Sequence, residues 1–208
     1  MTSPAVTSPA VTSPVDPNEV LMTGENSFIR LSPDGGKTQT DRVSHWRVLW
    51  CPAGAGHALF VQSTLTGGAV QIYADNVAVA RWLQTTIESL LFPAFADASL
   101  PVASAKFSRS GGAHAGEANA GASERVAAPG AEFVLSWRDF LPPFVLHMPP
   151  GMNNRPIGVF STFFPARAAQ VALNGRAAAN KPWLEKRGDR EASSACLAWS
   201  ETWVRPRG

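Results

Sequence analysis

The chain has no apolar run of about 18 residues, the length that a membrane-spanning helix requires. It has only two cysteines, Cys51 and Cys196, which lie in apolar surroundings without Cys-x-x-Cys spacing, so we expect buried free thiols in a reducing compartment. The N-terminus lacks the basic segment followed by an apolar core that marks a secretory signal. These absences predict a soluble, cytoplasmic protein with no membrane partner.

Charge is also scarce, since charged residues make up 16% of the 208 positions and the net charge is +2. Nucleic-acid binding requires a concentrated basic face. The nearest basic cluster is Lys181, Lys186, Arg187 and Arg190, which acidic residues interrupt. We therefore predict a solvated loop at this cluster and no nucleic-acid partner.

Motifs for cofactors and activated nucleophiles are missing. The segment Gly54-Ala55-Gly56 leads into a strand pattern rather than a helix, and Gly111-Gly112 precedes no Gly-Lys-Ser/Thr, so neither supports dinucleotide or phosphate binding. No Gly-x-Ser-x-Gly elbow occurs. The sequence predicts no cofactor.

The histidines do not have the i,i+4 spacing of a helical metal site. His45 and His147 fall within predicted strands, and His114 stands in a predicted loop beside Glu117. No metal site is predicted, although strands distant in sequence could still bring such ligands together.

The N-terminal segment is a proline-rich repeat. Residues 2–15 contain Thr-Ser-Pro-Ala-Val twice and then begin a third copy. A proline every five residues removes backbone donors and fixes φ, so the segment cannot build a helix or a sheet interior. The sequence predicts a disordered tail over residues 1–24 and a single β-rich domain over residues 25–208.

Beyond this tail, short extended runs alternate with turn residues. The predicted strands are 27–32, 43–51, 57–63, 69–73, 101–110, 132–139, 144–148, 157–164, 168–173 and 194–204. Residues 111–130 have no periodicity and are predicted to form a long loop. Residues 166–179 fit a strand or a helix, and we favour a strand that ends at the turn Asn174-Gly175.

One amphipathic helix is expected from Val77 to Leu91, capped by Asp75 or Asn76 and ended by Pro93. Its apolar face is formed by Ala80, Leu83, Ile87, Leu90 and Leu91, whereas Arg81, Gln84 and Glu88 face elsewhere. The predicted fold is mainly β (α+β), an antiparallel β-barrel or strongly bent sheet of about nine or ten strands with one helix. The architecture is similar to the calycin class of ligand-binding barrels, although no short lipocalin motif is present.

Candidate functional residues emerge when each strand is written as two faces, because a charge on an apolar face needs a partner or a function. Three strands place an ionisable residue there. The sets are Leu197, Trp199, Glu201 and Trp203; Phe133, Leu135, Trp137 and Asp139; and Ala103, Ala105, Phe107 and Arg109.

These residues predict a small-molecule site. Glu201 and Asp139 are the candidate acid and base, and Arg109 is the candidate anchor for an anionic group. Further ligand-binding candidates are Trp137, Trp199, Trp203 and His45. The alternatives are a structural ion pair of Arg109 with Asp139 or Glu201, and a plain aromatic core.

The leading hypothesis is therefore a small-molecule-binding domain, with acid/base activity of the lyase, isomerase or hydrolase type on a hydrophobic substrate with an anionic or carbonyl group. The loop 111–130 would then act as a lid. Two alternatives stay open, namely a non-catalytic carrier of an apolar ligand and a structural or partner-binding protein. Substrate identity and oligomeric state have no signal in the sequence.

Overall fold

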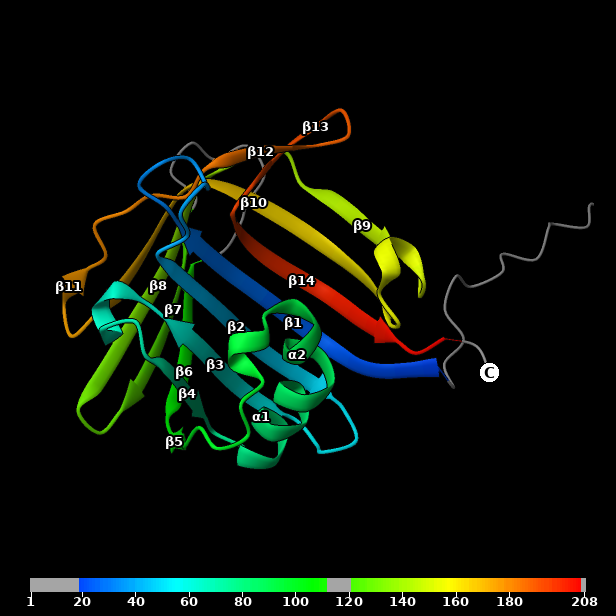
Figure 1. Ribbon diagram of the computed structural model, residues 1–208, viewed down its shortest axis with the longest axis horizontal. Helices are drawn as coiled ribbons and strands as arrows, with labels where there is room; N and C mark the ends of the chain where they lie inside the picture. Colours follow the sequence, from blue (N-terminus) through cyan, green and yellow to red (C-terminus); the bar gives the residue numbers. More distant parts are fainter. Residues whose placement is uncertain (1–18, 112–120, 207–208) are drawn as a thin grey trace, which may run out of the picture.

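The computed structural model describes residues 19–111 and 121–206. Strands account for 58% and helices for 14% of the structure, and the main sheet is a nearly closed, barrel-shaped arrangement of ten strands (Figure 1). The predicted β-barrel or bent sheet with one helix is confirmed. Within the described ranges, no helix is both long and apolar enough to cross a membrane.

The sheet has the strand order β5-β4-β3-β2-β1-β14-β10-β8-β7-β6, with β9 and β11 also paired to β10. Its strands are β1 Val20–Leu31, β2 Asp41–Trp50, β3 Gly56–Gln62, β4 Val70–Ala74, β5 Val102–Ser104, β6 Lys106–Gly111, β7 Gly121–Ala128, β8 Ala131–Phe140, β9 Phe144–Met148, β10 Gly158–Leu173, β11 Arg176–Ala177 and β14 Ala195–Val204. The described pairs are antiparallel except β4 with β5. Because Ala105 alone separates β5 from β6, the chain itself joins the two edges of the sheet.

The expected helix over residues 77–91 is confirmed. It consists of α1 (Val77–Leu83), one π turn η3 (Gln84–Glu88) and α2 (Ser89–Leu91). The Asn76 side chain accepts hydrogen bonds from the first free backbone N–H groups, as an N-cap does. The helix lies against the outer face of the sheet, where α1 contacts β3, β4 and β5 (Figure 1). Three short 3-10 turns complete the helical segments: η2 Thr64–Thr66, η4 Pro93–Phe95 and η5 Met152–Asn154.

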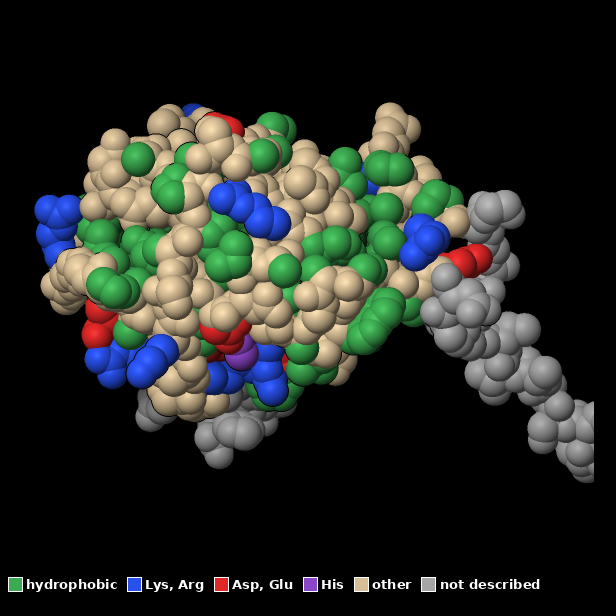
Figure 2. Space-filling view, turned by 90° about the horizontal axis from the view of Figure 1, so that it is seen from below, with side chains coloured by type: hydrophobic (Ala, Val, Ile, Leu, Met, Phe, Trp, Pro, Cys, Tyr) green, Lys and Arg blue, Asp and Glu red, His purple; other side chains and the backbone are tan. Residues whose placement is uncertain are grey.

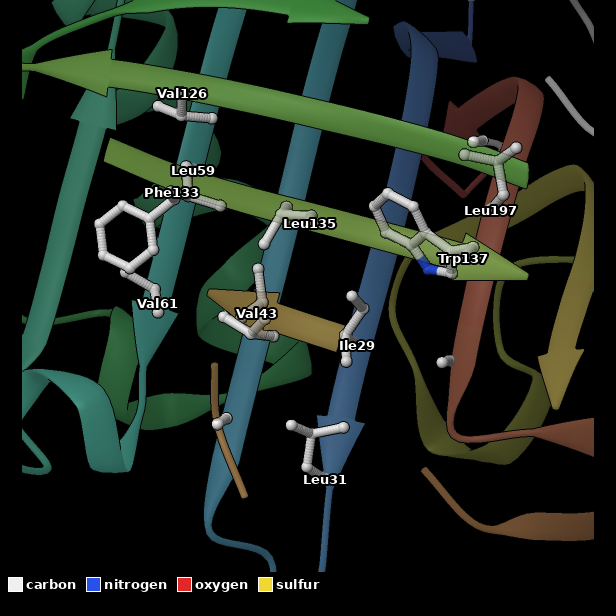
Figure 3. Packing of buried hydrophobic residues seen from close by; sticks show 14 of the residues in the cluster. Ile29, Leu31, Val43, Leu59, Val61, Val126, Phe133, Leu135, Trp137 and Leu197 are labelled. Atoms are coloured by element: carbon white, nitrogen blue, oxygen red, sulfur yellow. The ribbon is translucent and has the colours of Figure 1, made fainter. Parts of the chain in front are cut away.

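Two apolar cores lie on opposite faces of these strands. The inner core fills the barrel with fully buried side chains from both walls (Figure 3), including Ile29, Val43, Leu59, Phe133 and Trp137. The outer core packs the helix against the strands and includes Trp46, Phe60, Leu83, Ile87 and Trp203. Strands β1, β2 and β3 contribute side chains to both cores and are therefore buried on both faces. Side chains occupy the part of the barrel interior that these strands border.

Several boundaries differ from expectation. Strand β1 begins at Val20, which pairs with Val204, so residues 20–24 belong to the sheet rather than to the tail. The predicted loop 111–130 contains β7, in which Ala122, Glu124 and Val126 are buried at alternate positions, as in a strand with one inward face. Lys186, Arg187 and Arg190 of the basic cluster lie in a two-stranded hairpin, β12 (Leu184–Arg187) with β13 (Arg190–Ser193), rather than in a loop. Residues 168–173 do form a strand, as the end of β10.

Candidate functional site

Glu201 and Trp203 lie on the outer face of the barrel, whereas Leu197 and Trp199 belong to the inner core. Ser200, between them, has a φ of 52°, in the left-handed region. The β10–β14 pairing shifts register at this level, and an extra residue in one strand reverses the alternation of side chains. The prediction that these four residues share a face is therefore wrong.

Asp139 lies on the surface, far from an apolar face. Its side chain is 62% exposed, and its nearest cation is Arg167 at 4.0 Å. Asp139 also has a positive φ, of 53°, which turns it away from the face that Trp137 occupies. The Trp137 indole is buried in the inner core and donates a hydrogen bond to the Phe28 carbonyl at 3.1 Å. The structure thus does not bring Asp139 to Glu201.

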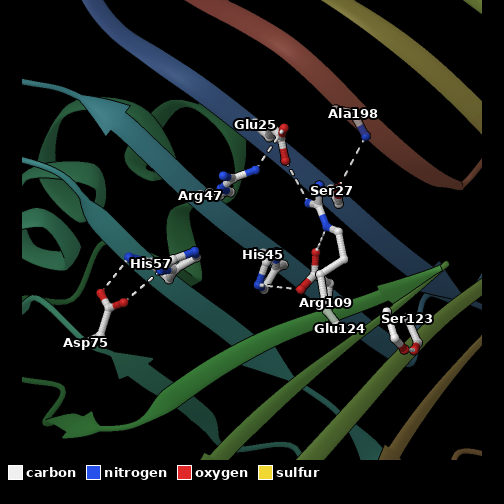
Figure 4. A network of polar contacts seen from close by, with 11 residues as sticks. Glu25, Ser27, His45, Arg47, His57, Asp75, Arg109, Ser123, Glu124 and Ala198 are labelled. Atoms are coloured by element: carbon white, nitrogen blue, oxygen red, sulfur yellow. Dashed lines mark hydrogen bonds and ion pairs between the residues drawn. The ribbon is translucent and has the colours of Figure 1, made fainter. Parts of the chain in front are cut away.

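Arg109 and His45 lie together at one end of the barrel interior (Figure 4). Arg109 forms ion pairs with Glu25, at 2.7 Å, and with Glu124, rather than with Asp139 or Glu201. The His45 Nε2 atom lies 3.9 Å from a Glu124 oxygen. Burial, with positive charge nearby, lowers the pKa of His45 to about 3. The predicted charged residues therefore occupy three separate places.

Glu201 lines a cavity of about 150 Å³ on the outer face. Its lining includes residues from the end of helix α2, from strand β9 and from β1, β2, β10 and β14, elements whose arrangement Figure 1 shows. Its apolar walls are Phe28, Val43, Leu91, Leu146, Val159, Phe163 and Trp203. Its polar walls are Asn26, Ser44, Glu201, Arg30, Arg42, Arg155 and Arg187. A volume of about this size matches a small molecule about as large as benzene.

The Glu201 side chain is a buried acid in this cavity. It is 2% exposed, and the Trp203 indole N–H donates a hydrogen bond of 2.5 Å to its Oε1 atom. Burial raises the pKa of Glu201 to about 8, with the Glu25 and Glu88 carboxylates adding to the shift and the Trp203 hydrogen bond opposing it. At neutral pH this carboxyl group is therefore protonated and can donate a hydrogen bond.

Glu88 is a second buried carboxyl group beside the same cavity. Its Oε1 atom accepts hydrogen bonds from the Ser44 hydroxyl and from the Trp46 indole at 2.6 Å, while its Oε2 atom has no partner. Burial raises the pKa of Glu88 against these hydrogen bonds. The Trp46 and Trp203 ring centroids are 6.1 Å apart, so the two acid–indole pairs lie side by side. Since Ser44 lines the cavity, its hydroxyl connects Glu88 to it.

The arginines give the cavity an excess of positive charge. Arg30 and Arg187 share one carboxylate, that of Glu185, at 3.3 and 2.9 Å. Arg42 donates to the Leu91 carbonyl at 3.2 Å, and the Arg30 Nε atom is buried without a partner. Four arginines line this wall, and the carboxyl groups near them are Glu185, which Arg30 and Arg187 share, and Glu88, which interacts with Arg42. The lining therefore favours an anionic group.

No protein-family model, curated protein or solved structure matches this chain. Its function is therefore inferred from the geometry of the site.

Glu88 is the residue that the sequence pattern misplaced most. The helical spacing put it, with Gln84, on the face away from the core, yet both side chains are fully buried. The π turn at Gln84–Glu88 explains the position of Glu88, because its wider turn rotates the following side chains around the helix, whereas Gln84 is buried by donating to the Phe95 and Asp97 carbonyls. Trp46 and Ser44 could have indicated a buried partner, since they share a strand face, but their partner lies 42 and 44 residues away.

A metal site is not evident in the described residues, where no three His, Cys, Asp or Glu side chains are grouped so as to hold an ion. His147 lies on β9 against Phe160, with a ring separation of 4.9 Å, and so is remote from His45. His114 lies outside the described residues.

Proposed function

We propose that the protein binds a small molecule, with an apolar body and an anionic or carbonyl group, in the outer-face cavity and acts on it by acid/base catalysis. The observation that carries this proposal is a protonated, buried Glu201 in a cavity whose wall holds four arginines. The arginines attract a negative group on the ligand, and the aromatic and aliphatic walls enclose its apolar body.

Glu201 is the general acid in this proposal. A carboxyl group whose pKa is about 8 holds its proton at neutral pH and can pass it to a carbonyl oxygen as negative charge develops there. The arginines stabilise the same developing charge without reorganising. Ser44 is the second polar group of this proposal, because its hydroxyl lines the cavity and donates a hydrogen bond to the buried Glu88 carboxyl group.

The test begins with a thermal-shift screen of small carboxylic acids, ketones and esters, since a ligand that binds the native state raises its melting temperature. Ligands that bind are then followed for turnover on the wild type and on Glu201→Gln. Asp139→Asn is the matched control, because it neutralises a carboxylate that is exposed and remote from the cavity.

We expect turnover to fall at least about a hundredfold in Glu201→Gln, the usual contribution of a general acid, and to persist in Asp139→Asn. Binding without turnover in the wild type would support a carrier of the same ligand class and reject the catalytic part. Equal turnover in Glu201→Gln and the wild type would remove Glu201 from the mechanism.

A further inference from the structure

A second cavity, of about 260 Å³, lies at the end of the barrel that contains Arg109 (Figure 4). Strands β2, β3, β6 and β7 supply its lining, which consists of Arg47, His57, Phe107, Ser108, Arg109 and Glu124. It shares no lining residue with the outer-face cavity, so a ligand here would be independent of the function proposed above. In Figure 2, basic and acidic side chains and a histidine gather near one edge of the molecule.

The deeper side chains of this cavity form a closed ion-pair network. Arg109 donates to Glu25 at 2.7 Å through Nη2 and to Glu124 through Nε. Burial raises the pKa of Glu124, and the Arg109 guanidinium opposes that shift. Arg109 thus bridges two carboxylates, and Glu25 also pairs with a second cation, Arg47, at 3.6 Å.

At the rim of the cavity, the Arg47 guanidinium is only weakly engaged by this network. The Arg47 side chain is 46% exposed, and its contact with Glu25 is long, at 3.6 Å. A guanidinium carries five N–H donors, so most of those on Arg47 remain available to a ligand. Arg47 is paired with His57 across β2 and β3, which places both side chains on the same face at neighbouring positions.

His57 is held in a fixed orientation. Its Nδ1 atom lies 2.7 Å from Asp75, whose carboxylate also accepts the His57 backbone N–H at 2.6 Å. The ring stacks on Phe107 with a centroid separation of 5.2 Å. Since a carboxylate only accepts hydrogen bonds, Nδ1 donates to Asp75, and the opposite edge of the ring turns towards Arg47 and His45 (Figure 4).

We propose that this cavity binds the oxyanion end of a small molecule, a carboxylate or a phosphate, between Arg47 and His57. Arg47 and Arg109 balance Glu25 and Glu124 here, and Asp75 pairs with His57, so the exposed Arg47 guanidinium and the neighbouring His57 ring would hold the oxyanion, rather than an excess of positive charge. An oxyanion in this position would accept charge-assisted hydrogen bonds from the Arg47 guanidinium and lie against the free edge of the His57 ring.

The experiment measures how fast diethylpyrocarbonate modifies each histidine, by peptide mass spectrometry on the full chain. Inorganic phosphate or acetate is added at constant ionic strength. His147 is the internal control, because it is exposed on β9 and remote from the cavity. We expect phosphate, acetate or both to slow the modification of His57 and to leave His147 unchanged, and the more effective probe identifies the end group.

Arg47→Met is the informative variant, since its side chain is largely exposed and its removal leaves the Arg109 network in place. It should weaken protection of His57 by at least about tenfold in probe concentration. Arg176→Met, which removes an exposed arginine on β11, should retain full protection. An unchanged His57 rate with both probes, equal slowing of His147, or full protection in Arg47→Met would each overturn the proposal.

Discussion

Replacing Glu201 by glutamine should make the protein less sensitive to alkaline pH. The folded-state pKa of Glu201 is about 8, against an ordinary value of 4.5. The native state therefore binds this proton more tightly than the unfolded state does, and the associated stability is complete below pH 4.5 and is lost as pH rises through 8. The glutamine amide has nearly the same shape as the neutral acid, and its oxygen can still accept the Trp203 hydrogen bond.

The magnitude is set by the size of the pKa shift. At about 1.4 kcal/mol per pKa unit, the wild type should lose about 4 kcal/mol relative to Glu201→Gln between pH 5 and pH 8.5. Urea unfolding followed by tryptophan fluorescence measures this difference at each pH. The comparison with the variant cancels every other titrating group. Parallel profiles of unfolding free energy against pH for the wild type and the variant, with or without a constant offset, would refute a protonated Glu201.

Three further outcomes are expected. Arg109→Met leaves Glu25 and Glu124 without their shared cation and should lower the free energy of unfolding by about 3 kcal/mol in urea titrations; a loss below about 1 kcal/mol would show that the network is not structural. His45 has its pKa lowered from 6.5 to about 3, so its stability contribution is present above pH 6.5 and lost below it. Between pH 6.5 and about 3, the free energy of unfolding of His45→Gln should therefore fall less steeply than that of the wild type, by about 1.4 kcal/mol per pH unit. An unchanged acid profile would contradict the burial of His45 as a neutral ring. Because burial raises the pKa of Cys51 and of Cys196, a thiol reagent at pH 8 should label neither in the native state and both after denaturation.

The fold was largely predictable because local patterns determine it. Alternating apolar residues and Gly or Pro turns identified most strands, and Asn76, Leu83 and Pro93 marked the helix. The prediction failed where alternation is interrupted. The left-handed residues Asp139 and Ser200 change the face on which the next side chains of their strands lie, and nothing in their own side chains requires that conformation.

The candidate site was predictable only in part. Glu201 is buried beside Trp203 as the strand pattern suggested, but its companions come from segments that no local pattern connects. A π turn brings Glu88 to Ser44 beside the cavity, and Arg30 and Arg42 were not among the predicted site residues. The barrel interior was expected to hold a ligand as one alternative, whereas aromatic side chains such as Trp137 and Phe133 fill its core. Such pairings depend on the register between distant strands and on packing.

The most direct test of the account is a calorimetric titration of the carboxylate that best stabilises the wild type, repeated on Arg42→Met and Arg176→Met. Arg42 lines the outer-face cavity, and Arg176 is an exposed arginine away from it. We expect binding to be retained in Arg176→Met and weakened at least about tenfold in Arg42→Met, the effect of losing one charge-assisted contact. Equal affinities in the three proteins would place the ligand elsewhere and contradict the central claim.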